Sequence, residues 1–281
     1  MQSATTEKAL QALIASHLVP ARQDDPLSAT VRSRLLDRVH QSAQAHKGYL
    51  TIRREDGNLP HSGSELRSRL LRSDEKHRVA IVQLHAGAPL PWPADATAQE
   101  IMVLEGALAS APADVNDGLL LAPVVTQQYA YHVRHLSKPG LALHAVGETT
   151  LYVRSLLVTE EHLSALEVNW WQLANPSSGW VDPARRRWLA SSAGVEVLPL
   201  RSDNEVASML VRFMPGASVP DHFHSIHEDC LVLEGEMFLG DILLRTGDYQ
   251  LAPAGTSHFG ENSDVGVLFY FHGALDPVLK G

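Results

Sequence analysis

Four side chains of the types that bind transition metals stand close together in the last third of the chain. His222, His224 and Glu228 lie within one short stretch, and His258 follows farther on. Residues two or four apart in a strand share a face, so the first three can point the same way. Three neutral imidazoles and one carboxylate suit Zn, Fe, Mn, Ni or Cu better than Ca or Mg. The pattern predicts one divalent transition metal per chain, Zn or else Fe, Mn or Ni, and assigns no catalytic residue.

The strands that carry these ligands have to fold back on one another. Gly240-Asp241 predicts a tight hairpin turn. Gly247, Pro253 and Gly255 predict the later turns that return the last histidine to the other three ligands. A jelly roll, which is an antiparallel β-barrel, brings both groups of ligands together.

Longer patterns surround both groups of ligands. The stretch from Gly216 to Gly235 has the form Gly-x5-His-x-His-x3-Glu-x6-Gly, which resembles the first cupin motif. The stretch from Gly247 to Asn262 has the form Gly-x5-Pro-x-Gly-x2-His-x3-Asn and resembles the second cupin motif. The segment between them, 236–246, is short. In this respect the chain resembles the ChrR-type cupins, the C-terminal domains of some zinc anti-sigma factors.

The resemblance to ChrR-type cupins implies a metal-binding regulatory or sensor protein that responds to reactive oxygen species or a small ligand. Many cupins with a similar ligand set are oxygenases, isomerases or decarboxylases. The alternative is therefore a mononuclear metal-dependent, dioxygenase-like enzyme that acts on a small organic substrate. A third reading is that the metal only rigidifies the barrel. The ChrR-type anti-sigma factors begin with a zinc domain containing Cys-x-x-Cys, and this chain has no cysteine before Cys230, which argues against sigma-factor binding.

Two short sequences recur at an offset of 129 residues. Leu71-Arg-Ser-Asp returns at Leu200, and Val103-Leu-Glu-Gly returns at Val232. Such a repeat indicates duplication of a structural unit. We therefore expect a mainly β chain of two tandem cupin domains, jelly-roll barrels at 49–165 and 166–281, after an N-terminal helical segment at 1–48.

The first copy of the repeated unit, residues 49–165, lacks the metal-binding residue types found in the second copy, residues 166–281. Its equivalent positions hold Pro93, Asp95, Gln99 and Lys138. Proline has no side-chain donor, glutamine is a poor ligand and lysine brings a positive charge. We expect no metal in 49–165, and Glu100, one residue away from a ligand position, is expected to point outward.

Two helices are expected before the strands begin. Residues 5–19 have apolar positions at helical spacing and end at Pro20, and a second helix follows Pro26 with Ser28 as its cap and ends near Gly48. Their apolar faces need a partner. We expect them to pack on the barrels or at a homodimer interface, and the alternative is a docking surface for a protein partner.

Composition excludes several classes of function. The chain has 281 residues, a net charge of -9 and a pI of about 5.9, which argues against a nucleic-acid surface. It contains no run of 18 apolar residues, so no membrane span is expected. A single cysteine, Cys230, and no visible secretory signal favour the cytoplasm. Cys230 is expected to be a small buried hydrophobe, and the alternative is an oxidant-sensing thiol beside the metal.

Overall fold

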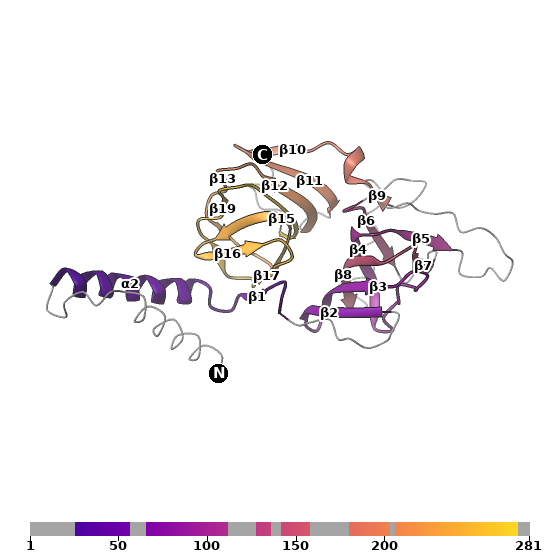
Figure 1. Cartoon of the computed structure of the whole chain (residues 1–281), viewed down its shortest axis with the longest axis horizontal. Coiled ribbons are helices and arrows are strands. Elements are labelled where there is room, and N and C mark those ends of the chain that lie inside the picture. The colour runs from indigo at the N-terminus through magenta and orange to yellow at the C-terminus, as the bar shows by residue number, and fades with distance from the viewer. Residues whose placement is uncertain are drawn as a thin grey trace. The chain divides into compact units, whose positions relative to one another are not determined.

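The computed structural model describes residues 26–56, 66–111, 128–135, 142–157, 180–202 and 206–274 (Figure 1). The chain divides into two units, Met1–Lys47 and Gly48–Gly281. In the first unit, α2 (Pro26–Ala45) confirms the second expected helix, but it begins at Pro26, so Ser28 lies inside it. The helix expected over 5–19 lies outside the described residues.

The apolar side chains of α2 are exposed within the described residues. Val31, Leu35 and Val39, which the sequence places on one stripe, are all exposed. No helix in the described ranges is both long and apolar enough to cross a membrane.

The second unit begins with a six-stranded sheet in the order β2-β3-β8-β4-β6-β9, beside which β5 pairs with β7. All of the pairings are antiparallel. The strands are β2 (Leu66–Ser73), β3 (His77–Leu84), β4 (Ala96–Glu105), β5 (Leu108–Ala111), β6 (Tyr131–His135), β7 (Ala142–Ala145), β8 (Thr149–Leu157) and β9 (Trp180–Val181).

A larger antiparallel sheet follows, with the main order β1-β17-β15-β20-β12-β11-β10, and its strand β15 begins at the predicted ligand Glu228, whereas His222 and His258 lie in a separate two-stranded sheet, β14-β18. Its first strand, β1 (Leu50–Ile52), precedes the whole six-stranded sheet in sequence. The short 3₁₀ helix η4 (Pro183–Arg185) connects the two sheets. The other strands are β10 (Leu189–Ser192), β11 (Val195–Ser202), β12 (Val206–Phe213), β13 (Ala217–Ser218), β14 (His222–Phe223), β15 (Glu228–Leu239), β16 (Ile242–Arg245), β17 (Tyr249–Ala252), β18 (Ser257–His258), β19 (Asn262–Ser263) and β20 (Val267–Ala274).

Alternate residues of β15 face two different cores. Cys230 and Val232 pack in a cluster made within the larger sheet. Leu231 and Leu233 pack in a second cluster, which also contains residues of the six-stranded sheet such as Leu71. A third cluster fills the six-stranded part alone. Because side chains alternate along a strand, burial of both faces explains why β15 is apolar at both parities.

Strand pairing repeats at the offset found in the sequence. Ile81 of β3 lies opposite Tyr152 of β8, and Leu210 of β12, 129 residues after Ile81, lies opposite Tyr270 of β20. The repeated Leu-Glu-Gly ends in a glycine with a φ of 82° at Gly106 and 76° at the later copy. At Gly106 a Cβ would lie 2.4 Å from the Glu148 carbonyl oxygen, so only glycine fits there.

Candidate metal centre

The four predicted ligands come from separate short elements. His222 of β14 lies opposite His258 of β18, and Glu228 is the first residue of β15. β14 ends at Phe223, so the expectation that one continuous strand carries the first three ligands is wrong. The intervening turn is held by backbone hydrogen bonds from His224 N to Thr256 O (2.8 Å) and from Gly255 N to His224 O (2.8 Å).

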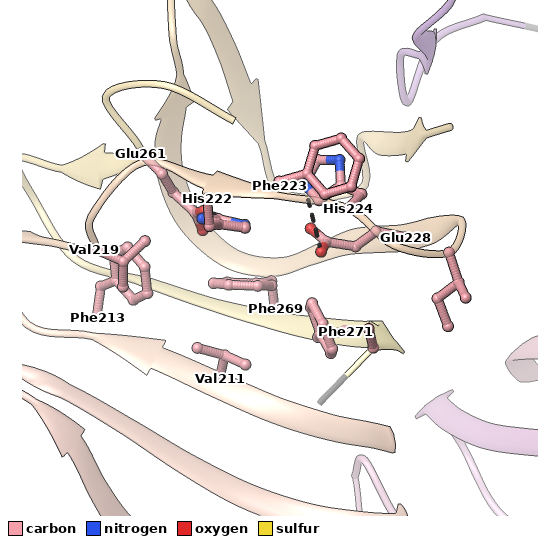
Figure 2. Close-up of a pocket in the computed structure, with 12 residues that line it drawn as sticks. Val211, Phe213, Val219, His222, Phe223, His224, Glu228, Glu261, Phe269 and Phe271 are labelled. Carbon is pink, nitrogen blue, oxygen red and sulfur yellow. Dashed lines mark ion pairs between the residues drawn. The ribbon is translucent and has the colours of Figure 1, made fainter. Parts of the chain in front are cut away.

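The structure brings all four side chains together. One potential ligand atom from each of His222, His224, Glu228 and His258 lies within 4.8 Å of the others. The Glu228 carboxylate is 3.7 Å from His224 Nε2 and 3.4 Å from His258 Nδ1. Figure 2 shows His224 and Glu228 facing each other above an apolar pocket. The predicted cluster is therefore present as a geometric unit that could hold a metal ion.

Hydrogen bonds behind two imidazoles determine which ring nitrogen faces the cluster. His222 Nδ1 lies 3.1 Å from Pro220 O, which can only accept, so Nδ1 carries the proton. His224 Nδ1 lies 3.0 Å from Thr256 Oγ1, whose own hydrogen is donated to Pro253 O. Both Nε2 atoms therefore present lone pairs, which is the tautomer that a metal site requires. Lone pairs and a carboxylate that converge in this way fit a bound cation.

Glu261 is a second carboxylate at the cluster, and the sequence analysis missed it. Its side chain is buried, and its Oε2 lies 3.9 Å from both His222 Nε2 and His258 Nδ1. Burial raises the pKa of Glu261 to about 7. The next residue, Asn262, belongs to the cupin-like pattern, but its amide donates to Gly260 O in the local turn. The only signal in the sequence is an acid three residues after His258.

Tyr49 also reaches the cluster from far away in the sequence. Its ring centroid lies 5.6 Å from that of His258, and its hydroxyl donates to Ser257 O at 2.7 Å. Because 208 residues separate Tyr49 from Ser257, no local pattern could have indicated this contact.

Two neighbours of the ligands stay outside the cluster. His227 accepts a hydrogen bond from Ala254 N at 3.1 Å and is not one of the four clustered side chains. Cys230 is buried, and burial together with the charges of Glu261 and Glu228 raises the pKa of its thiol well above the usual value. Because the thiolate is the reactive form, this protonated, buried thiol fits the expected packing role rather than oxidant sensing.

An apolar pocket adjoins the cluster, with an empty volume of about 590 Å³ including its open mouth. Figure 2 shows Phe269, Phe271 and Val211 on the side of the pocket across from the imidazoles. His258 does not line the pocket. The lining residues are Val211, Phe213, Val219, His222, Phe223, His224, Ile226, Glu228, Glu261, Phe269, Phe271 and Ala274.

Several aromatic side chains near the ligands in sequence lie outside this pocket. Tyr249 and Tyr270 pack in the cluster shared with the six-stranded sheet, and His272 bonds to Ser208. The reason is strand parity, since Phe269 and Phe271 face the pocket and the residues between and after them face the opposite side.

The first copy shows no comparable cluster among the described residues. Asp95 forms an ion pair with Arg78 at 2.8 Å, and Gln99 donates to Ser155. Lys138 lies outside the described residues. Glu100 does point away from the ligand side, but it is buried against the larger sheet rather than exposed to solvent.

Comparison with known proteins agrees with this architecture. Residues 177–276 match the family model of the ChrR cupin-like domain. A comparison with curated proteins finds no sequence match.

Three solved structures illustrate the likeness in fold. A candidate dioxygenase from Nostoc punctiforme is 16% identical over 83% of this chain and 84% of its own, with a TM-score of 0.58. The protein Ylba from E. coli is 11% identical over 82% and 91%, with a TM-score of 0.56. Oxalate decarboxylase from Lactobacillus farciminis, solved with formate, is 13% identical over 81% and 86%, with a TM-score of 0.54.

At these identities the structural likeness shows the fold alone, and the family match is what names the domain. That match spans all four clustered side chains, the pocket and both cupin-like motifs. The resemblance expected from the motifs is thereby confirmed. Residues 177–276 of this mainly β chain thus match the ChrR cupin-like domain in sequence, and the chain has a cupin-like fold.

Proposed function

We propose that the chain is built of two tandem cupin domains, of which the second holds one divalent transition metal and binds a small organic molecule in the adjoining pocket. His222, His224, Glu228 and His258 would hold the metal. One observation carries the proposal: three of these four residues also line an apolar pocket. A molecule in the pocket would therefore reach the metal directly, which favours a metal-dependent enzyme over a purely structural ion.

The protein's own residues would orient the substrate. The phenylalanines and valines of β12 and β20 would bind an apolar or aromatic body by excluding water from it. The polar groups of the pocket, the imidazoles and carboxylates, lie on its opposite side. A substrate with one polar head and a small apolar body fits this division. The bound metal would act as a Lewis acid toward the head group, and a redox metal would add electron transfer.

Metal analysis of the purified protein tests the proposal. About one metal per chain is expected by mass spectrometry after anaerobic purification, and the variant His224→Ala should lose it. His227→Ala is the matched control and should keep its metal, because His227 bonds to Ala254 N outside the cluster. Wild-type protein that binds no metal would refute the proposal.

The identity of the bound metal distinguishes an enzyme from a regulatory or structural protein. Iron or manganese would favour an oxidoreductase or a related enzyme and justify screening of small aromatic and aliphatic acids for turnover. Zinc has no redox chemistry, so finding zinc would favour a regulatory or structural role. Two metals per chain would contradict the prediction that the first copy binds none.

A ligand sensor is the second candidate, and the position of Tyr49 favours it. Tyr49 contacts His258 and leads directly into β1, which pairs with β17 of the larger sheet. The same segment follows the helix α2, whose apolar side chains would suit a protein partner. Hydrogen exchange with and without metal tests this idea. If the protein is a sensor, metal binding should slow hydrogen exchange in both residues 48–54 and α2. A change confined to the pocket would contradict the sensor and favour the enzyme.

A further inference from the structure

Glu261 is held in place by its neighbours on both sides. It lies between β18 and β19, where its carbonyl oxygen accepts a hydrogen bond from Val219 N at 3.1 Å. The preceding Gly260 N donates to the Asp221 side chain at 2.9 Å. These backbone contacts fix the direction in which the carboxylate leaves the chain. Figure 2 shows it beside His222, at the edge of the pocket.

The carboxylate of Glu261 lies almost as close to the imidazoles as that of Glu228 does. Its Oε2 is 3.9 Å from His222 Nε2 and from His258 Nδ1, whereas the Glu228 oxygens lie 3.4 and 3.7 Å from their imidazole partners. Two ligands of one ion, each at about 2.1 Å from it, lie about 3.0 to 4.2 Å apart, depending on the angle between them. Glu261 therefore lies at a ligand-to-ligand distance from two of the imidazoles, although it is not part of the group of four whose ligand atoms all lie within 4.8 Å of one another.

Charge gives an independent reason to place a cation beside Glu261. Its ion-pair partners among the described residues are imidazoles, with no lysine or arginine. His222 donates its Nδ1 proton to Pro220, so the nitrogen that faces Glu261 is a lone pair. An ionised, buried carboxylate that faces a lone pair is stabilised by a cation placed between them.

We infer that Glu261 is a fifth protein ligand of the metal centre. This inference rests on the proposed metal site and goes beyond its four cupin-like ligands. With Glu228, it supplies two negative charges that balance a divalent ion. Five protein ligands would leave one position of a six-coordinate ion for a substrate.

The variant Glu261→Gln tests the inference because it keeps the size of the side chain and removes its charge. Its affinity for Zn²⁺ or Co²⁺, measured by competition with a chelator, should fall at least tenfold. The visible absorption of the Co²⁺ form should become more intense, since cobalt absorbs more strongly at lower coordination number. Asp264→Asn is the matched control, because Asp264 is an exposed acid in the next turn, between β19 and β20, and its affinity and spectrum should equal those of wild type.

Stability of the metal-free proteins distinguishes a ligand from a merely structural residue. Without metal, Glu261→Gln should be at least as stable as wild type, because it removes a buried charge that lacks a cation. A second variant, Glu261→Asp, keeps the charge on a shorter side chain and should retain more metal affinity than the glutamine.

Three outcomes would overturn the inference: unchanged affinity and Co²⁺ spectrum in Glu261→Gln, a lower melting temperature of that variant without metal, or an aspartate variant no better than glutamine. Failure of the metal site itself is separate. In that case the wild-type protein would bind neither Zn²⁺ nor Co²⁺, and the comparison between variants would show no binding at all.

Discussion

At the scale of single residues, Gly273 determines how closely β20 approaches the ligand Glu228. A Cβ added to Gly273 would lie 3.2 Å from Glu228 Cγ and 2.8 Å from Phe271 Cζ. Neither neighbour can move freely, since Glu228 belongs to the cluster and Phe271 lines the pocket. The absent side chain therefore leaves room for the ligand to keep its position.

The variant Gly273→Ala should bind metal about tenfold more weakly than wild type, because the added methyl group displaces Glu228. Chelator competition measures the change. Gly147→Ala is a suitable control, because a Cβ added there would meet nothing within 4 Å and its backbone needs no positive φ. Equal affinities of the two variants would show that Glu228 does not depend on this close approach.

At the scale of elements, the short strand β1 belongs to the larger sheet although it precedes the smaller one in sequence. Leu50–Ile52 pair with Tyr249–Leu251 of β17. Arg53, which follows β1, donates to Leu243 O at 2.5 Å and to the Asp248 carboxylate at 2.8 Å. Asp248 is buried, so the residue that follows β1 supplies the cation that pairs with it.

Arg53→Ala should lower the free energy of unfolding by about 1–3 kcal/mol, because it leaves the buried Asp248 carboxylate with fewer hydrogen bonds. Urea denaturation measures this change. Arg187→Ala, at an exposed arginine beyond η4, should change it by less than about 0.5 kcal/mol. If Arg53→Ala lowered the free energy of unfolding by as little as Arg187→Ala, the backbone hydrogen bonds to Asp248 would be enough to stabilise its carboxylate.

At the scale of the whole molecule, two buried ion pairs join the two sheets at positions related by one offset in the sequence. Arg72 contacts Asp229 at 3.0 Å, and Arg201 contacts Glu100 at 2.7 Å. The offset of 129 residues relates the two arginines to each other, and likewise the two acids. Each pair therefore joins the six-stranded sheet to the larger one, and Arg154 contacts both acids.

His272 makes this buried network sensitive to acid. Its Nδ1 donates to Ser208, which donates to Glu100. Burial, followed by the nearby Arg154, lowers the pKa of His272 to about 3, below the usual value of 6.5. Between these values the unfolded chain binds more protons than the folded one, so stability is present above pH 6.5 and is lost as pH falls toward 3.

The metal-free protein should therefore lose about 2 kcal/mol through His272 between pH 7 and pH 5. Denaturation at a series of pH values measures the slope. His272→Gln keeps a donor for Ser208 and should flatten the slope, whereas His85→Gln, at an exposed histidine, should not. An identical slope in His272→Gln would contradict the neutral, buried state of this imidazole. The depressed pKa values of Glu100 and Asp229 act in the same direction, but only below about pH 4.

The sequence alone determined which residues form the cluster and which turns return them. The identities and spacings of His222, His224, Glu228 and His258 match the cupin motifs, and turn residues indicate the return of His258, so the cluster could be predicted although the first three do not share one strand. The same holds for the repeated Leu-Glu-Gly, where backbone contact at Gly106 excludes any side chain. Local conformation is encoded within a few residues, and a pattern can therefore reveal it.

Only the tertiary structure decided what surrounds the cluster. Tyr49 reaches His258 because β1 joins a sheet formed mostly by residues far downstream, and Arg72 meets Asp229 across two copies. Glu261 and the pocket likewise depend on how β12, β19 and β20 are placed beside the ligands. Such contacts follow from strand order and close packing over long sequence separations, which spacing within one motif does not encode.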